Sequence, residues 1–479
     1  SKTLKTKAFC RWRKRTLYTR KPCNRREQSK AKAKICIWKT RAIPFFSGST
    51  TLQTLNVIAD GAVANLSGTL NIKNLYMADG AAHILSDSFF DRIGTSHAGS
   101  NAKLTVSANV LTNKIYGSLK TGGDGVLTLT GTATDYSEIT PDSLNRLVVG
   151  ENQKVKFPAG TLKNADIAGE MLVESGKSVS FGTLNLAKGS TSEIGGTITV
   201  SNDFYLNPDA ELTSNGTIRL NGANNVINKS GAIFAGTFDL GDNTATTFSN
   251  AAELTNLTTN GNSRINLAQN KLVVNGTMNV AGAAASPAMI AMKFTELDSE
   301  SGVLDLTSGI VGSGSLAFDV TVDYSAVASD RQEIKAVTGK NKSDFDAAGV
   351  ALPTHHNLRY RWDVKDSCTS GDGVCYSLTV IKTAEELAKE YSSNKNDAAT
   401  AKGMLDDGLF THAMSETYAL ASHLHNLSQT DSVNYVKALN AVSPDVSGAR
   451  TWQANGMQNR VMGTLNSRMT ALIPALTKA

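Results

Sequence analysis

The sequence predicts an all-β-dominated fold: a right-handed parallel β-solenoid, followed by a β-hairpin cap and a C-terminal α-helical segment. Three observations support this prediction. A Gly-Thr motif recurs with a 20-residue period, each copy opens a short strand of alternating apolar and polar residues, and helical patterning begins only after residue 382. At 479 residues the chain is too long for one compact core, so we expect a repeating architecture or several domains.

Composition favours many short strands joined by turns over a helical bundle or an α/β enzyme. Charged residues make up 19% of the chain and aromatic residues 6%, and there are 40 Gly against 9 Pro. Ser, Thr, Asn and Gly provide turn residues, while Val, Leu and Ile provide short apolar runs.

The repeat consists of Gly-Thr followed by an apolar, a polar and an apolar residue. Copies begin at 196, 216 and 236, and another begins at 276, twice 20 residues further on. One coil of this length cannot bury its apolar side chains alone, whereas stacked coils can, with strands about 4.8 Å apart. A β-sandwich array also uses alternating strands, but it requires no fixed phase. We therefore expect a solenoid over 47–290, with a core that includes Ile198, Val200, Ile218, Leu220, Phe238 and Leu240.

A different β structure is expected over 291–382, where strands lengthen and aromatic residues become frequent. The final coil of a solenoid exposes unpaired strand edges that a cap must cover. Long hairpins carrying Tyr360, Trp362 and Tyr376 could form that cap.

Two cysteines in this region, Cys368 and Cys375, are spaced to close one small loop. Two glycines lie among the six residues between them, so a disulfide is feasible, and two free thiols in a loop are the alternative. A cysteine-poor body with one tight pair is typical of export into an oxidising space.

Residues 1–46 differ sharply from the rest of the chain. Residues 1–45 hold 16 Lys or Arg and one acid, whereas the other 434 residues hold 32 basic and 41 acidic side chains. Interleaved Trp12, Tyr18 and Trp38 would suit a nucleic-acid binder. The absence of strand or helix periodicity instead favours a disordered or non-native leader that can be removed without loss of stability, with no role in binding nucleic acid.

Helical patterning occupies 383–479. Thr383-Ala-Glu-Glu386 matches a capping box, and Asp431 opens a second helix that ends at Ser443-Pro444. The apolar stripe of that helix is Val433, Val436, Leu439 and Val442. A third helix is expected from about residue 449, with an apolar stripe at Trp452, Val461, Leu465 and Met469.

These C-terminal motifs, Asn434-Tyr-Val-Lys-Ala-Leu-Asn-Ala-Val-Ser-Pro444 and Trp452 to Ser467-Arg-Met469, resemble the type V secretion autotransporters. The resemblance implies a solenoid passenger, an autochaperone-like cap and a helix that threads an outer-membrane barrel through Trp452, Val461, Leu465 and Met469. It also implies export through the periplasm to the bacterial cell surface or outer membrane, assisted by periplasmic chaperones and the barrel-assembly machinery. In that family about twelve barrel strands follow such a helix, and we expect them after Ala479.

Motifs for catalysis are absent from the sequence. There is no Gly-x-Ser-x-Gly, His-Glu-x-x-His or P-loop, and Gly312-Ser-Gly-Ser315 is interpreted as a turn. His355-His356 lacks a third metal ligand, and no cofactor site is predicted. His423 and His425 are interpreted as solvated side chains, and Asp406-Asp407 as a helix-surface charge or a turn. The acids of the repeat show no 20-residue phase that would stack them with a basic partner: Asp203, Asp209, Asp239 and Asp242.

The leading functional hypothesis is therefore a non-catalytic, surface-exposed or secreted passenger whose solenoid presents an adhesive or structural surface. Repeated Thr, Asn and Ser positions would form exposed ladders able to contact sugars or proteins on a host or a neighbouring cell. The alternatives are a secreted solenoid enzyme acting on polysaccharide and a nucleic-acid binder that uses the basic segment.

Overall fold

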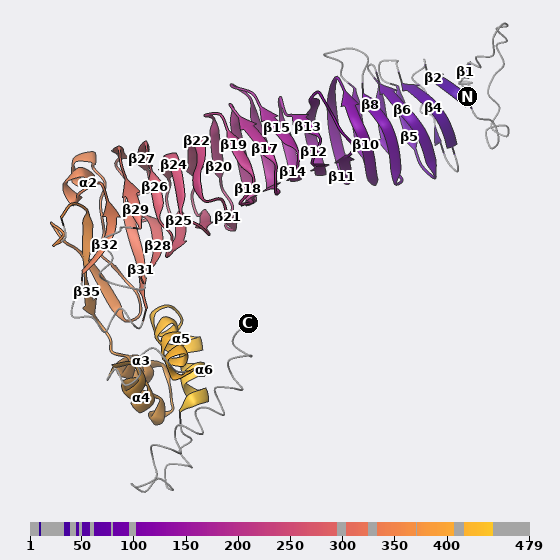
Figure 1. Ribbon diagram of the computed structural model, residues 1–479. Helices are drawn as coiled ribbons and strands as arrows, with labels where there is room; N and C mark the ends of the chain where they lie inside the picture. Colours follow the sequence, from indigo (N-terminus) through magenta and orange to yellow (C-terminus); the bar gives the residue numbers. More distant parts are fainter. Residues whose placement is uncertain are drawn as a thin grey trace, which may run out of the picture. The chain divides into compact units, whose positions relative to one another are not determined.

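The computed structural model describes residues 9–10, 33–38, 45–46, 50–57, 62–77, 80–94, 102–294, 303–323, 333–369, 371–406 and 416–443. The chain divides into two compact units, residues 1–258 and 259–479. The predicted fold class is confirmed, because most elements are parallel strands of a β-solenoid and a few helices follow at the C-terminal side (Figure 1).

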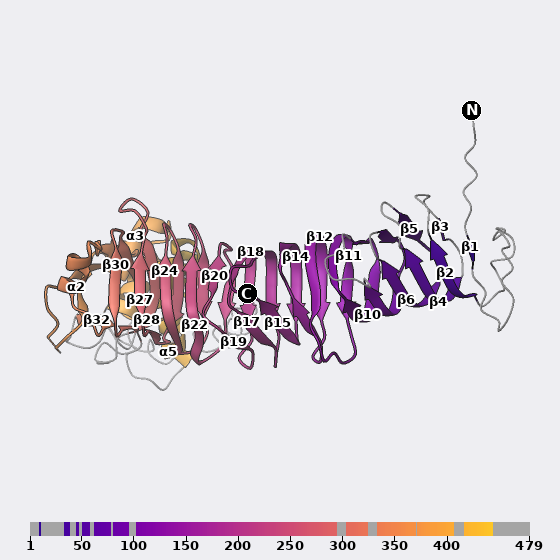
Figure 2. The same ribbon diagram turned by 90° about the horizontal axis from the view of Figure 1, so that it is seen from above.

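The first unit is a parallel β-solenoid in which each strand pairs with its equivalent in the coils before and after it. Seen from above, these strands lie side by side in chain order (Figure 2). They are β1 (Phe9–Cys10), β2 (Ala33–Trp38), β3 (Phe45–Phe46), β4 (Thr50–Val57), β5 (Val63–Leu66), β6 (Leu70–Met77), β7 (Ala81–Ile84), β8 (Ser88–Gly94), β9 (Lys103–Val106), β10 (Asn109–Tyr116), β11 (Ser118–Leu129), β12 (Ser137–Val149), β13 (Lys154–Lys156), β14 (Ala159–Ile167), β15 (Glu170–Val173), β16 (Ser178–Leu186), β17 (Thr191–Ile194), β18 (Thr197–Leu206), β19 (Glu211–Thr213), β20 (Thr217–Leu220), β21 (Asn225–Ile227), β22 (Gly231–Leu240), β23 (Ala245–Phe248) and β24 (Ala252–Thr259).

The 20-residue period appears as register between successive coils. Ile198 pairs with Ile218, and Ile218 pairs with Phe238, on β18, β20 and β22. All three side chains are buried, as are Val200, Leu220 and Leu240 in the next inward position. The regular phase thus places like side chains above one another in a dry core, and the outward residues between them on β18 and β20 stay partly or fully exposed.

The glycine that opens each copy of the motif allows two coils to approach closely. A Cβ at Gly216 would lie 2.1 Å from the carbonyl oxygen of Gly196 and 2.6 Å from that of Ile194. Both atoms belong to the backbone of the preceding coil, so a side chain at this position would force the coils apart.

Part of the basic N-terminal segment forms strands. β2 pairs in parallel with β4, from Ala33 opposite Leu52 to Trp38 opposite Val57, and β1 pairs antiparallel with β2. The expectation that this segment lacks strand structure is therefore wrong for 33–38. Its separability from the solenoid stays a prediction.

The second unit begins with further parallel coils. Strand β28 (Ala288–Phe294) pairs in parallel with β31 (Leu316–Val322) without a shift in register, and Ile290 lies opposite Phe318. Parallel pairing therefore continues beyond residue 290, where the sequence analysis ended the solenoid. The strands of these coils are β25 (Arg264–Ala268), β26 (Leu272–Val274), β27 (Thr277–Val280), β28 (Ala288–Phe294), β29 (Leu304–Leu306), β30 (Gly309–Gly312) and β31 (Leu316–Val322).

Antiparallel hairpins follow the last parallel strands. β32 pairs in parallel with β29 and antiparallel with β35, and β35 pairs antiparallel with β34. Tyr360, Trp362 and Tyr376 are all fully buried here, so the aromatic residues form the core of the cap. The elements of the β cap are β32 (Glu333–Thr338), α2 (Lys342–Ala348), β33 (His355–His356), β34 (Tyr360–Val364) and β35 (Val374–Val380).

The helical segment has its own apolar core, which includes Leu387, Leu424, Tyr435 and Leu439. The predicted caps are present: Thr383 forms a capping box with Glu386, and the Asp431 side chain accepts a hydrogen bond from the Asn434 amide. The helices are α3 (Ala384–Tyr391), α4 (Lys395–Ala401), the π-helix η1 (Lys402–Asp406), α5 (Glu416–Thr430) and α6 (Ser432–Val442).

The predicted stripe of α6 is partly wrong. Leu439 and Val442 are buried, but Val433 is 62% exposed and Tyr435 takes the core position. The third predicted helix, with Trp452, Val461, Leu465 and Met469, lies outside the described residues.

Candidate functional site

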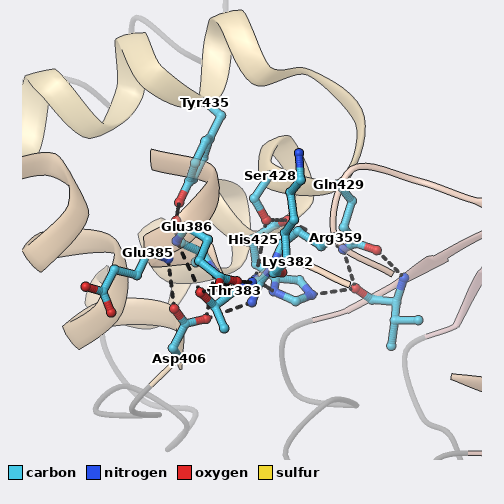
Figure 3. A network of polar contacts seen from close by, with 12 residues as sticks. Arg359, Lys382, Thr383, Glu385, Glu386, Asp406, His425, Ser428, Gln429 and Tyr435 are labelled. Carbon is cyan, nitrogen blue, oxygen red and sulfur yellow. Dashed lines mark hydrogen bonds and ion pairs between the residues drawn. The ribbon is translucent and has the colours of Figure 1, made fainter. Parts of the chain in front are cut away.

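A network of buried polar side chains connects the helical segment to the β cap within the second unit (Figure 3). Arg359, which directly precedes β34, lies at its centre. Its guanidinium donates to Asp406 at 2.8 Å and to the Ser428 hydroxyl at 3.5 Å, and it lies 3.3 Å from Nδ1 of His425. The Arg359 and Asp406 side chains are only 5% and 15% exposed, so this is a nearly dry ion pair.

Asp406 also binds the N-terminus of α3. Its two carboxylate oxygens accept hydrogen bonds from the backbone amides of Ala384 and Glu385, each at 2.9 Å. A carboxylate at this position satisfies amides that have no partner within the helix and interacts favourably with the helix dipole. Asp406 therefore connects η1, α3 and the segment that enters β34.

Two side chains of α5 bind the end of strand β31. Gln429 accepts a hydrogen bond from the Val322 amide at 3.0 Å and donates one to the Val322 carbonyl at 2.8 Å. His425 Nε2 lies 2.9 Å from the same carbonyl oxygen. The Gln429 amide thus satisfies the backbone groups of Val322 as a neighbouring strand would.

His425 is neutral in this environment. Burial lowers its pKa to about 3, and the positive charge of Arg359 acts in the same direction. With the proton on Nε2, the ring donates to the Val322 carbonyl and accepts from Arg359 at Nδ1, so both nitrogens are engaged. This arrangement orients and holds the helices and leaves the imidazole no free nitrogen for proton transfer or metal binding.

The interpretation of His425 as a solvated side chain is wrong, because it is buried beside Arg359. Asp406 is not a surface charge either, because its side chain is only 15% exposed and pairs with Arg359. His423 is half-buried, and Asp407 lies outside the described residues. No local pattern marks these residues, since Arg359 lies 47 positions from Asp406 and 66 from His425.

Cys368 and Cys375 form a disulfide with their Cα atoms 5.3 Å apart. Glu333 lies beside them, and these three side chains are close enough together to resemble a metal-binding cluster. Both sulfur atoms are bonded to each other, however, and Glu333 forms an ion pair with Lys365 and accepts a hydrogen bond from the Thr369 amide at 2.8 Å. These contacts therefore stabilise the loop that the disulfide closes. Because both sulfur atoms are in the disulfide, neither is a free thiolate that could bind a metal.

His355 and His356 stack at the edge of the β cap, with ring centroids 6.3 Å apart. His355 Nε2 lies 3.6 Å from Asp319, which also pairs with Arg264 at 2.5 Å. The neighbouring His355 side chain, together with Arg264, holds the pKa of Asp319 below its ordinary value. Within the described part of the chain, no three-ligand cluster includes either histidine.

Ion pairs bridge neighbouring coils of the first unit. Arg219 and Asp239 are register partners 2.6 Å apart, and Arg146 contacts Asp166 at 2.7 Å. Both pairs are separated by 20 residues in sequence. The prediction that Asp239 has no basic partner one 20-residue period away is therefore wrong. The 20-residue spacing between Arg219 and Asp239 is the sequence signal that could have predicted this ion pair.

The predicted outward ladders are also present in the repeat. Thr197, Thr217 and Thr237 are consecutive register partners, and each is half-buried on the outer side of its strand. Ser315, at the end of the Gly312–Ser315 turn, is buried, and its hydroxyl donates to the Ala351 carbonyl at 3.4 Å.

Comparison with known proteins gives little further information. No protein-family model and no solved structure matches the chain. Globin-1 of Anadara broughtonii is 27% identical over 123 residues, which are 25% of this chain and 82% of the globin. Globins are built of packed helices, whereas the described residues of this chain are mainly strands, so the likeness carries no argument about the fold.

Among the described residues, each helix is either too short or too polar to cross a membrane.

Proposed function

We propose that the chain is the non-catalytic passenger of a bacterial autotransporter, a rigid solenoid that presents an adhesive or structural surface outside the cell. The observation that carries the proposal is the order of parts in the second unit: parallel coils, then an antiparallel cap, then a helical segment. The C-terminal motifs noted in the sequence resemble those that lead into the barrel of autotransporters, and this order of parts supports the same assignment.

The regular stacking of the first unit supports a presenting role. Each coil contacts its neighbours through paired strands, buried ladders such as Ile198–Ile218–Phe238 and ion pairs such as Arg219–Asp239. A scaffold of this kind holds its outer side chains at fixed spacing, which suits a surface that contacts an extended partner.

Export through the periplasm is part of the proposal. The disulfide between Cys368 and Cys375 supports an oxidising compartment, because such bonds persist outside the cytosol. The partners proposed are the chain's own outer-membrane barrel, the barrel-assembly machinery and periplasmic chaperones.

A non-catalytic role is proposed because acids that lie in phase on the solenoid are engaged with cations. Asp166 and Asp239 each form a short ion pair with an arginine of the preceding coil. Glycoside hydrolysis requires two carboxylates, one of them protonated, facing a common substrate site. Incubation with polysaccharides and measurement of new reducing ends tests this part of the proposal, and cleavage would contradict it.

Surface display tests the whole proposal. The full chain, preceded by a secretion signal and followed by a twelve-strand barrel, receives an epitope in the turn at Gly189, where nothing packs within 4 Å of an added Cβ. We expect antibody to label intact cells. The matched control carries Ile218→Asp, which should prevent coil formation and abolish labelling. A chain that folds but remains in the periplasm would contradict the proposed function.

A further inference from the structure

A stripe of tyrosines and basic residues runs across successive coils on one outer face of the first unit. Tyr76, Gly94 and Tyr116 are consecutive register partners on β6, β8 and β10, whose order is visible in Figure 1. Arg92 and Lys114 pair two positions earlier on the same strands. We call the set the tyrosine stripe; it comprises Tyr76, Arg92, Lys114, Tyr116, Tyr136 and Lys154.

An exposed apolar pair, the Phe89–Leu111 ridge, precedes the basic residues of the tyrosine stripe on β8 and β10. Phe89 and Leu111 are register partners on β8 and β10, three residues before Arg92 and Lys114. Their side chains are 47% and 40% exposed, although apolar residues at the inward positions of the same strands are buried. The ridge is one side chain wide.

Cations of the stripe are held against its rings. Arg92 Cζ lies 5.5 Å and Lys114 Nζ 4.9 Å from the ring centre of Tyr116, and Lys154 Nζ lies 5.8 Å from that of Tyr136. Cation–π contacts restrict these long side chains before any ligand arrives. Less conformational entropy is then lost on binding, as in other preorganised sites.

The lysines of the stripe are balanced by carboxylates. Lys114 pairs with Asp135 at 2.9 Å and Lys154 with Glu170 at 2.7 Å, and the Tyr136 hydroxyl donates to Glu170 at 3.3 Å. Donors and acceptors therefore stand side by side. A polyanion such as nucleic acid needs cations without such partners, whereas an uncharged hydroxyl both donates and accepts and suits this mixture.

The strand pairing argues against a polypeptide partner. β8 pairs with β6 and β10, and β10 pairs with β8 and β11, so neither strand has a free edge to which a peptide strand could be added. A globular partner needs about 800 Å² on each side, which a ridge one side chain wide does not provide. A thin polymer with apolar ring faces and hydroxyl edges fits the surface.

We propose that the tyrosine stripe and the Phe89–Leu111 ridge bind a neutral linear oligosaccharide that lies across successive coils. Its sugar rings place their C–H faces on Phe89 and on the tyrosines, and its hydroxyls bond with Arg92, Lys114 and Glu170. This inference names the ligand class of the presented surface and in that respect rests on the proposed function.

Calorimetric titration of the purified full chain tests the inference. The probes are cellohexaose, maltohexaose and chitohexaose, with hyaluronan hexasaccharide and oligothymidine as polyanions, in salt of about 0.15 M. We expect at least one neutral hexasaccharide to bind and to weaken about tenfold with Phe89→Ala, since a stacked aromatic ring contributes on the order of one such factor. The matched control is Tyr391→Ala, which removes an exposed ring (45%) from helix α3 of the second unit and should leave affinity unchanged.

Three results would overturn the inference: none of the neutral hexasaccharides binds, a polyanion binds more tightly, or Tyr391→Ala weakens binding as much as Phe89→Ala does. Thermal melts of both variants show whether any loss reflects unfolding, and Tyr116→Phe provides a second, milder variant that should weaken binding less. A chain that is displayed on cells but binds no sugar would refute this inference and leave the proposed function standing. A purified chain that binds sugar but is never displayed would do the reverse.

Discussion

In the solenoid of the first unit, a side chain's main partner lies about one coil away in sequence; in the helical segment it lies far away. Arg219 and Asp239 are 20 positions apart, whereas Arg359 and Asp406 are 47 apart and Val322 and Gln429 are 107 apart. The solenoid therefore repeats one modest set of contacts many times. The helical segment has an apolar core of its own but is joined to the β structure through the Arg359 network, so a single substitution should damage the two regions differently.

The largest effect is expected when a charge enters the core ladder of the solenoid. Ile218→Asp would place a carboxylate between Ile198 and Phe238, both fully or almost fully buried. We expect a loss of about 5 kcal/mol or more in the free energy of unfolding, from desolvation of the carboxylate and lost apolar burial. Urea unfolding of variant and parent measures it. Thr217→Asp, on the outer side of the same strand, is the control, and an equal loss there would show that Ile218 is not a core residue.

The second effect concerns the polar network. Arg359→Met keeps much of the side-chain volume but leaves the Asp406 carboxylate without its cation, so we expect a loss of about 3–4 kcal/mol. Circular dichroism should show the helices melting before the strands. Arg361→Met is the matched control, because its ion pair with Asp363 is half-exposed. Similar losses for the two variants would contradict a special role for Arg359.

The smallest effect is a pH dependence restricted to the helical segment. The folded pKa of His425 is about 3, below its ordinary value of 6.5, so the unfolded chain takes up a proton that the folded chain does not. Its contribution to stability is therefore complete above pH 6.5 and is lost as the pH falls towards 3. We expect the free energy of unfolding of the helical segment to be about 2 kcal/mol lower at pH 5 than at pH 7. His425→Gln should abolish this slope and His356→Gln, an exposed control, should keep it; unchanged slopes in both would contradict the assignment.

Sequence reasoning reached the solenoid core because its signal is periodic. The spacing of Ile198, Ile218 and Phe238 is the coil length itself, and local hydrogen bonds at Thr383 and Asp431 mark the starts of two helices. The same period also relates Arg219 to Asp239. This pair is missed when only the positions of the acidic residues are compared with one another.

The polar network around Arg359 could not be predicted from periodic or local signals in the sequence. Arg359, Asp406 and His425 come from three separate parts of the chain, and each looks like an ordinary surface residue in its own sequence context. Only tertiary packing brings them together. Tyr435 shows the same limitation on a smaller scale, because the helical stripe favoured Val433 and the packing of α6 instead buries the tyrosine.

Residue-resolved hydrogen exchange of the parent and of Arg359→Met tests most directly the claim that the two regions are stabilised differently. In the parent, the amides of β16, β18 and β20 and those of α3, α5 and α6 should all be protected. In Arg359→Met, the helical amides should lose protection together by a common factor of about 100 or more, as a loss of about 3–4 kcal/mol requires, while the strand amides keep theirs. Helical amides that lose protection one by one, or strand amides that lose as much as the helices, would contradict the account.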